Sequence, residues 1–204
     1  LDTSLGFTTT GNKNNADVLW QGKVHKGYRL FDDSHLLLAA KHEGHHGRGG
    51  TRLLTELTGE FFHVLSDRWT LYFKNVIRFS HKQYLDQPVA LGGGKALRGY
   101  PLQYQHGKDS LLLTGELRYY PGINLYRLFD MGAAVFIDTG KTSGTTPREN
   151  IEPGWLQSAG IGLRFFTPHA RQEGQVIHMD LAYPLTDNPD IDGWEIRLES
   201  KQAF

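Results

Sequence analysis

Hydrophobic and polar residues alternate along most of this chain with a period of two. Between 155 and 166, for example, Ala159, Ile161 and Leu163 alternate with Gly160 and Gly162. Such alternation is typical of a β-strand with one apolar face. The pattern predicts no helix and about ten strands. The strands are expected at residues 3–10, 16–31, 34–46, 51–65, 69–80, 109–120, 125–138, 155–166, 175–185 and 193–204.

Two arrangements of these strands are compatible with the alternation. In a soluble antiparallel sandwich or a lipocalin-like barrel, the apolar faces point inward. In a transmembrane β-barrel they point outward to lipid, and the polar faces line the lumen. The second arrangement is favoured because most of the strands are longer than is usual in soluble sheets and suit a tilted crossing of a bilayer. Tight connections also alternate with long polar ones, such as 139–154.

Particular side chains fit the membrane arrangement. Aromatic residues recur near the ends of the apolar faces, where a membrane interface would place them. They are Trp20, Tyr28, Trp69, Phe79, Tyr119, Trp155, Phe165, Tyr183 and Trp194. We expect the charged residues of the opposite faces to line a watery lumen and to serve mainly for solvation. They include Arg118, Arg164, His178, Asp180, Arg197 and Glu199.

Composition narrows the classes of function. The 204 residues suit one domain, and 22 Lys and Arg balance 22 Asp and Glu, so excess positive charge that would favour a nucleic-acid partner is absent. The chain has no Cys, which excludes disulfides and Cys-based metal sites. A mean hydropathy of −0.44 is typical of soluble proteins, but membrane β-barrels share it because only half of their strand residues face lipid. Without a signal peptide or an initial Met, we expect a mature product or part of a longer protein.

Four segments, in order along the chain, resemble a known family. They are LGGGKALRGYP (91–101), LLTGELRYYP (112–121), AAVFIDTG (133–140) and SAGIGLRFF (158–166). Together they are similar to the signature loop and strands of the bacterial surface antigen superfamily. These outer-membrane barrels insert other barrels, as BamA-like and TamA-like assembly proteins do, or export proteins in two-partner secretion. The resemblance implies a transmembrane β-barrel of the bacterial outer membrane that catalyses no bond chemistry.

The resemblance also implies a role for the loop. It would fold back into the lumen, where Arg98 would pair with Asp138 and Glu116 on the inner wall and act as a latch. Alternation supports this independently, because Glu116 falls on the polar face of its strand and Asp138 is out of phase with Ile137. A guanidinium between carboxylates forms charge-assisted, bidentate hydrogen bonds. The loop residues with an expected role are Gly92, Gly93, Gly94, Leu97, Gly99 and Tyr100. The glycines allow positive φ, and Tyr100 serves as an anchor. On the inner wall we assign Gly140, Gly160 and Gly162, and we expect the last two to leave room for the loop tip.

The extent of the chain follows from the same resemblance. Barrels of this family have sixteen strands, five of them after the loop, and five are predicted after it here. We therefore expect the C-terminal part of a barrel over residues 1–204, with about six strands and the POTRA domains absent from this chain. Phe204 is similar to the terminal aromatic residue that the assembly machinery recognises on barrel substrates. Ten strands alone would either close into a narrower barrel or leave edges that pair between copies.

Other candidate chemistry is weak. The segment KHEGHHGRGG (41–50) contains His42, Glu43, His45 and His46, which are metal-ligating types, but the flanking glycines favour a solvated turn at a strand end. The three glycines before Lys95 lack the GK[ST] ending and the helix of a phosphate-binding loop. There is no G-x-S-x-G and no recognisable arrangement of Ser, His and Asp for hydrolysis. We expect no metal, no cofactor and no enzymatic activity.

The sequence thus predicts an all-β outer-membrane barrel that inserts or translocates proteins. Its partners would be outer-membrane lipid and client or secreted polypeptides, not nucleic acid. Two alternatives stay open. The barrel could anchor or export a fused passenger, such as a patatin-type phospholipase, or the chain could be a soluble β-sandwich binding module.

Overall fold

The computed structural model describes residues 2–9, 16–47, 50–82, 89–93, 97–126, 128–144, 154–166, 175–186, 191 and 193–202. Most of these residues are in β-strands, and none of them is helical. Within this part of the chain, therefore, no helix has the length and hydrophobicity to cross a membrane. The strands are β1 (Asp2–Thr9), β2 (Ala16–Phe31), β3 (Ser34–Gly47), β4 (Gly50–Ser66), β5 (Trp69–His81), β6 (Val89–Leu91), β7 (Gln105–Gly107), β8 (Asp109–Leu125), β9 (Phe129–Ser143), β10 (Leu156–Phe166), β11 (Gln175–Pro184) and β12 (Glu195–Gln202).

Ten of these strands form one antiparallel sheet. Their order is β1-β2-β3-β4-β5-β8-β9-β10-β11-β12, so strands that follow one another in the sequence are also neighbours in space. The exception is the hairpin of β6 and β7, which pair with each other in a separate sheet. Among the described strands, β1 is hydrogen-bonded to β2 alone and β12 to β11 alone. The prediction of an all-β, antiparallel fold with ten long strands is confirmed.

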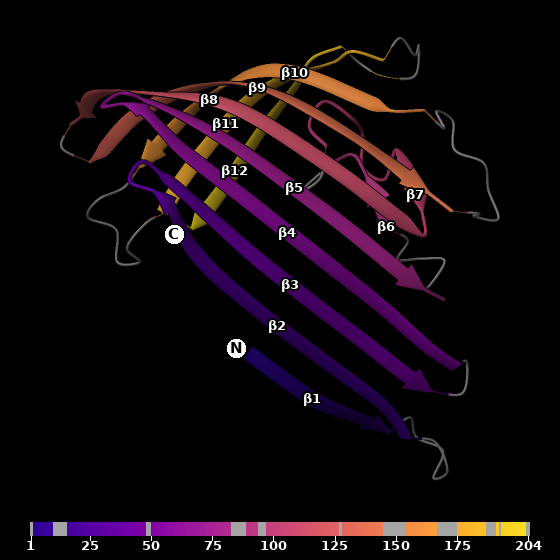
Figure 1. The fold of residues 1–204 in the computed structure, drawn as a ribbon. Coiled ribbons are helices and arrows are strands. Elements are labelled where there is room, and N and C mark those ends of the chain that lie inside the picture. The colour runs from indigo at the N-terminus through magenta and orange to yellow at the C-terminus, as the bar shows by residue number, and fades with distance from the viewer. Residues whose placement is uncertain are drawn as a thin grey trace.

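The two ends of the strands differ in their connections. Short turns join β2 to β3, β4 to β5 and β8 to β9 at one end, which we call the short-turn end. The β6–β7 hairpin lies between the last residue of β5 and the first residue of β8, at the opposite end. We call this the hairpin end. The sheet curls strongly, and the hairpin lies beside the ends of β5 and β8 (Figure 1).

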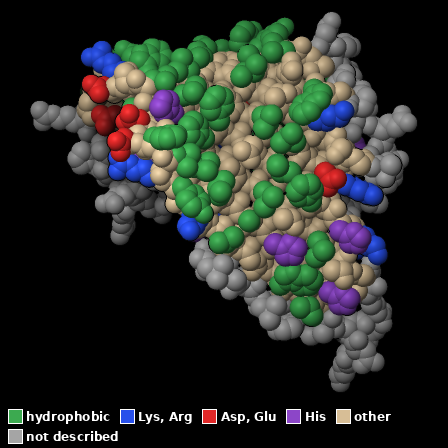
Figure 2. All heavy atoms as spheres, viewed as in Figure 1, with side chains coloured by type: hydrophobic (Ala, Val, Ile, Leu, Met, Phe, Trp, Pro, Cys, Tyr) green, Lys and Arg blue, Asp and Glu red, His purple; other side chains and the backbone are tan. Residues whose placement is uncertain are grey.

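The two faces of the sheet carry different side chains. In β9, Val135 and Ile137 are 53% and 55% exposed, whereas Ala134, Phe136 and Asp138 are buried. The first set lies on the outer face, and the second lies on the inner face, against the hairpin. Hydrophobic side chains are spread across the outer face, with charged ones mainly near its margins (Figure 2). The outer face also carries exposed Val24, Tyr28, Leu38, Leu57, Phe73, Phe79, Ile161, Leu163, Met179, Ile196 and Leu198.

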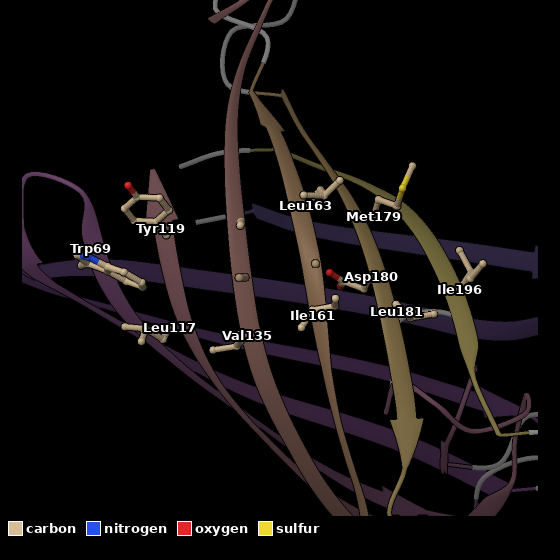
Figure 3. Close-up of a pocket in the computed structure, with 13 residues that line it drawn as sticks. Trp69, Leu117, Tyr119, Val135, Ile161, Leu163, Met179, Asp180, Leu181 and Ile196 are labelled. Carbon is tan, nitrogen blue, oxygen red and sulfur yellow. The ribbon is translucent and has the colours of Figure 1, made fainter. Parts of the chain in front are cut away.

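The outer face is hollowed over strands β8 to β12. The hollow measures about 630 Å³, and the side chains around it are almost all apolar. Figure 3 shows Leu117, Val135, Ile161 and Leu181 on successive strands, with Trp69 and Ile196 at the two sides. Exposed apolar surface of this extent marks a contact with another molecule or with a membrane.

Two predicted boundaries were wrong. We expected one strand to end near 120 and the next to begin at 125, but β8 continues to Leu125. The pairing register of β8 with β9 shifts between Tyr119 and Ile123, and this irregularity lets the strand pass Pro121, which has no N–H to donate. The expected long polar connection from 139 is also shorter, because β9 continues to Ser143. The short strands β6 and β7 had no signal in the alternation.

Candidate functional site

The loop carried by the β6–β7 hairpin turns tightly. The amide of Gly93 donates to the carbonyl of Tyr100 at 2.8 Å, and Gly92, Gly93 and Gly99 have φ values of 97°, 65° and 83°. These backbone conformations disfavour residues with a Cβ. Leu97 is fully buried and Tyr100 is almost so. The loop is therefore packed against the wall, and Gly94 lies outside the described residues.

Arg98 points from this loop into a group of carboxylates. Its Nε and Nη2 atoms donate to the two oxygens of Asp138 at 2.6 and 2.8 Å, and its Nη1 donates to Glu116 at 3.0 Å and to Asp180 at 2.9 Å. Asp138 is on β9, Glu116 on β8 and Asp180 on β11. A loop that reaches three strands of one curled sheet at the same time must lie on its concave side.

Two more arginines complete this group. Arg118 Nε donates to Glu116 at 2.8 Å, and Arg164 Nη1 donates to Asp180. The group thus contains three guanidinium groups and three carboxylates, so its formal charges balance. Burying an ion is costly unless it is paired and hydrogen-bonded, and each member of the group has such partners. We call Arg98, Arg118, Arg164, Glu116, Asp138 and Asp180 the arginine–carboxylate cluster.

The charge of Arg98 is maintained by these partners. Burial alone would lower the pKa of its guanidinium. The hydrogen bonds and charge of Asp138, with the charges of Glu116 and Asp180, outweigh burial and raise that pKa above its ordinary value. Arg98 consequently stays protonated at any pH that the fold tolerates.

An aromatic ring lies beneath the guanidinium. The Cζ atom of Arg98 is 3.5 Å from the ring centroid of Phe136, a cation–π contact in a nearly dry environment. The ring is seated over Gly160, where a Cβ would lie 2.4 Å from Phe136 Cζ. At Gly162 a Cβ would lie 2.0 Å from Asp180 Oδ1. We expected these two glycines to leave room for the loop tip, but the structure places Phe136 and Asp180 in that space.

The loop residue Tyr100 lies beside the arginine–carboxylate cluster, and its side chain contacts the inner face of β10. Its hydroxyl donates to the carbonyl of Gln157 at 2.6 Å, accepts from the amide of Gln157 at 3.1 Å, and lies 2.7 Å from the hydroxyl of Thr186. Its ring packs in a small apolar core between the hairpin and the wall. That core consists of Val76, Leu91, Leu97, Tyr100, Tyr104, Leu112 and Leu156. Gly140 belongs to this contact, because a Cβ there would lie 3.0 Å from Leu91 Cδ1.

The loop also contacts the edge strand β12. The amide of Gly99 donates to the carboxylate of Glu195, and Arg197 Nη2 donates to the carbonyl of Leu97 at 3.3 Å. Arg197 and Glu195 are themselves paired at 3.3 Å. The loop is thereby bound to β8, β9, β10, β11 and β12, which are the five strands that follow it.

The structure also differs from several sequence-based expectations. Arg164, His178, Asp180 and Arg197 are buried, so they do not serve to solvate a watery lumen. Asp180 was not expected as a partner of Arg98, although alternation places it on the polar face. Phe136 and Glu195 carried no signal in the sequence. Phe204 lies outside the described residues.

The side chains His42, Glu43, His45 and His46 all lie within β3 rather than in a turn. Because side chains alternate along a strand, His42 and His46 are on the outer face, while Glu43 and His45 are on the inner face. His45 lies 3.3 Å from Asp17, and Glu43 pairs with Lys41. Within the described residues, no three metal-ligating side chains are placed to hold an ion.

Comparison with known proteins places the fold. No protein-family model and no curated protein sequence matches this chain. Among solved structures, the chain is similar to CdiB from Escherichia coli, with 16% sequence identity and a TM-score of 0.58. The alignment covers 99% of this chain and 49% of that chain, so the chain spans about half the length of CdiB. At this identity the likeness concerns the fold.

Proposed function

We propose that this chain is the C-terminal part of an outer-membrane β-barrel of the bacterial surface antigen superfamily, which inserts or translocates proteins. The loop of residues 92–101 occupies the lumen, and Arg98 latches it to the inner wall. The barrel is completed by strands outside this chain, as the sixteen-stranded pattern of the family implies. POTRA domains precede it in the same protein. The chain itself catalyses no reaction.

One observation carries this proposal. Arg98 is the third cation of a cluster that holds three carboxylates, and it is the only one of the three that comes from the loop. If Arg98 left the cluster, two cations, Arg118 and Arg164, would face three carboxylates. One negative charge would then stay uncompensated. Return of the loop to the wall is therefore electrostatically favoured, as a latch requires.

The outer face supports placement in a membrane. Large apolar side chains project from it along the long strands, while the buried charged side chains of Glu116, Asp138 and Asp180 are on the inner face. Backbone polar groups are expensive in hydrocarbon unless they are paired. The unpaired backbone groups at the free edge of β12 would therefore be unfavourable in the membrane. A client strand that pairs with this edge would satisfy them. The fold shared with CdiB is consistent with this family assignment.

Bilayer recording tests the proposal. The complete protein, reconstituted into a planar bilayer, should give ion currents that an added unfolded polypeptide interrupts transiently. In liposomes it should also raise the folding rate of a second outer-membrane barrel if its role is insertion. Absence of any current and of any effect on folding would refute a role in both processes. Interruption of the current without faster folding of the second barrel would indicate that the protein translocates polypeptides and does not insert barrels.

A further inference from the structure

Two identical cross-strand pairs lie on the outer face near the hairpin end. His42 Nδ1 is 2.9 Å from Thr55 Oγ1, and His46 Nδ1 is 2.8 Å from Thr51 Oγ1. The register of β3 with β4 produces both pairs, because it sets each His directly opposite its Thr. Each bond orients an imidazole ring. The Nε2 atoms of both rings have no hydrogen-bond partner in the part of the chain that the structure describes.

Trp20 lies between these two pairs. It is opposite Gly44, which separates His42 and His46 on the same face of β3. Its indole covers Gly44 so closely that a Cβ there would lie 2.0 Å from the ring. The indole N–H can only donate, and no described residue accepts from it. We call Trp20, His42 and His46 the histidine–tryptophan surface.

The charges around this surface favour an anion. On the outer face of β2 to β5, the described positions carry no carboxylate, and the nearest further titratable groups there are Lys26 and His81. The acidic side chains of these strands are on the inner face, where Asp17 is engaged by His45 and Glu43 by Lys41. Lys82 lies near Gly50 at the same end of the sheet. When the imidazoles are protonated, the surface is cationic throughout.

The position of the surface suits a lipid headgroup. From His42 toward the short-turn end, the outer positions of β3 become apolar, with Ala40 and Leu38 next along the strand. Histidine side chains gather at the hairpin end of this face, with hydrophobic ones among them (Figure 2). His42 and His46 are four residues apart, or about 13 Å along the strand. A single small anion cannot bridge that distance, whereas the headgroups of lipids packed against the strand can.

We propose that the histidine–tryptophan surface binds the phosphate-bearing headgroups of anionic lipids in the leaflet at the hairpin end. The acyl chains of these lipids cover the apolar outer positions of β2 to β4, and the oriented Nε2–H and indole N–H groups donate to their phosphate oxygens. A protonated imidazole attracts phosphate more strongly than a neutral one, so binding strengthens as pH falls. The inference rests on the proposed membrane location of the outer face.

A lipid titration tests it. The detergent-solubilised protein is titrated with phosphatidylglycerol and, separately, with phosphatidylcholine at pH 6 and pH 8, and bound lipid is counted by native mass spectrometry. The wild type should prefer phosphatidylglycerol at pH 6, and the preference should shrink at pH 8. The double variant His42→Gln, His46→Gln should bind phosphatidylglycerol about fivefold more weakly at pH 6, as expected for the loss of two exposed ion pairs.

Two further variants sharpen the result. His25→Gln removes an exposed imidazole from the inner face of β2 and should leave lipid binding unchanged. Trp20→Phe keeps an aromatic ring but loses the N–H donor, and should weaken binding at both pH values. Equal affinity of the wild type and the double variant at pH 6 would overturn the inference. Failure of the wild type to float with phosphatidylcholine vesicles would instead contradict the proposed membrane location.

Discussion

The backbone amide of Gly99 donates a hydrogen bond to the carboxylate of Glu195, 96 residues later in the chain. Glu195 opens β12, the last strand of the sheet, and Arg197 of the same strand donates to the carbonyl of Leu97. The loop on the concave side is thus bonded to the strand whose other edge pairs with no described strand. Because the loop and β12 are bonded to each other, a change in one should affect the other. A client or neighbouring strand that pairs with the edge of β12 should therefore also influence the position of the loop.

Glu195→Ala should loosen both elements at once. The change removes the acceptor of the Gly99 amide and the partner of Arg197. Because Glu195 is partly exposed, we expect a moderate effect, with amides of residues 97–104 and 195–202 exchanging about tenfold faster. Hydrogen exchange measured by mass spectrometry checks this. Glu43→Ala, which removes the partner of Lys41 on β3, is the matched control and should leave both segments as they are. Faster exchange in 195–202 alone would show that the loop is held without β12.

Arg98→Ala should release the loop. Three buried carboxylates would then face two guanidinium groups, and breaking a buried ion pair in this way costs about 3–5 kcal/mol. Limited proteolysis should cleave the loop of the variant under conditions that leave the wild type intact. Arg98→Lys should give a partial effect, since a lysine keeps the charge but cannot bond both oxygens of Asp138 in a fork.

Arg78→Ala provides the control for the latch. Arg78 pairs with Glu56 at 2.6 Å, but both side chains are partly exposed, so its loss should cost no more than about 1 kcal/mol. The loop should keep its protease resistance in this variant. Equal resistance of the Arg98→Ala variant and the wild type would show that pairing with Asp138 does not hold the loop.

Asp180 should be energetically coupled to Arg98. Its two oxygens accept from different arginines, Arg98 and Arg164. In a double-mutant cycle of Arg98→Ala with Asp180→Asn, we expect a coupling free energy of about 0.5–3 kcal/mol in denaturant unfolding. Pairing Arg98→Ala with Glu56→Gln, whose partner is Arg78, should instead give additive effects. A coupling with Asp180 no larger than that with Glu56 would remove Asp180 from the latch.

Gly160→Ala should disturb Arg98 without touching it. The added methyl would lie 2.2 Å from the carbonyl oxygen of Leu181 and 2.4 Å from Phe136 Cζ, so the ring beneath the guanidinium must move. Overpacking of this kind costs about 1–3 kcal/mol, which thermal unfolding can measure. At Gly22 a Cβ would meet nothing within 4 Å, so Gly22→Ala is the matched substitution and should be neutral or slightly stabilising. Similar melting of the two variants would contradict the packing role of Gly160.

The sequence by itself determined the strands and the faces of their side chains. A strand turns successive side chains to opposite sides, so the alternation of apolar and polar residues was sufficient to place Glu116 on one face and Val135 on the other. It did not determine where a strand can continue past an interruption. The bulge that carries β8 past Pro121 depends on pairing with β9, which no local pattern contains.

Tertiary structure decided which polar residues meet. Asp180, Phe136 and Glu195 come together with the loop because the sheet curls and sets β8, β9, β11 and β12 around one concave space. The register of each pair of strands fixes the height of each side chain in that space, and the curl fixes the distance between strands that are not neighbours. Both are properties of the whole sheet. The side chains that Arg98 contacts therefore emerge only when the pairing of all these strands is known.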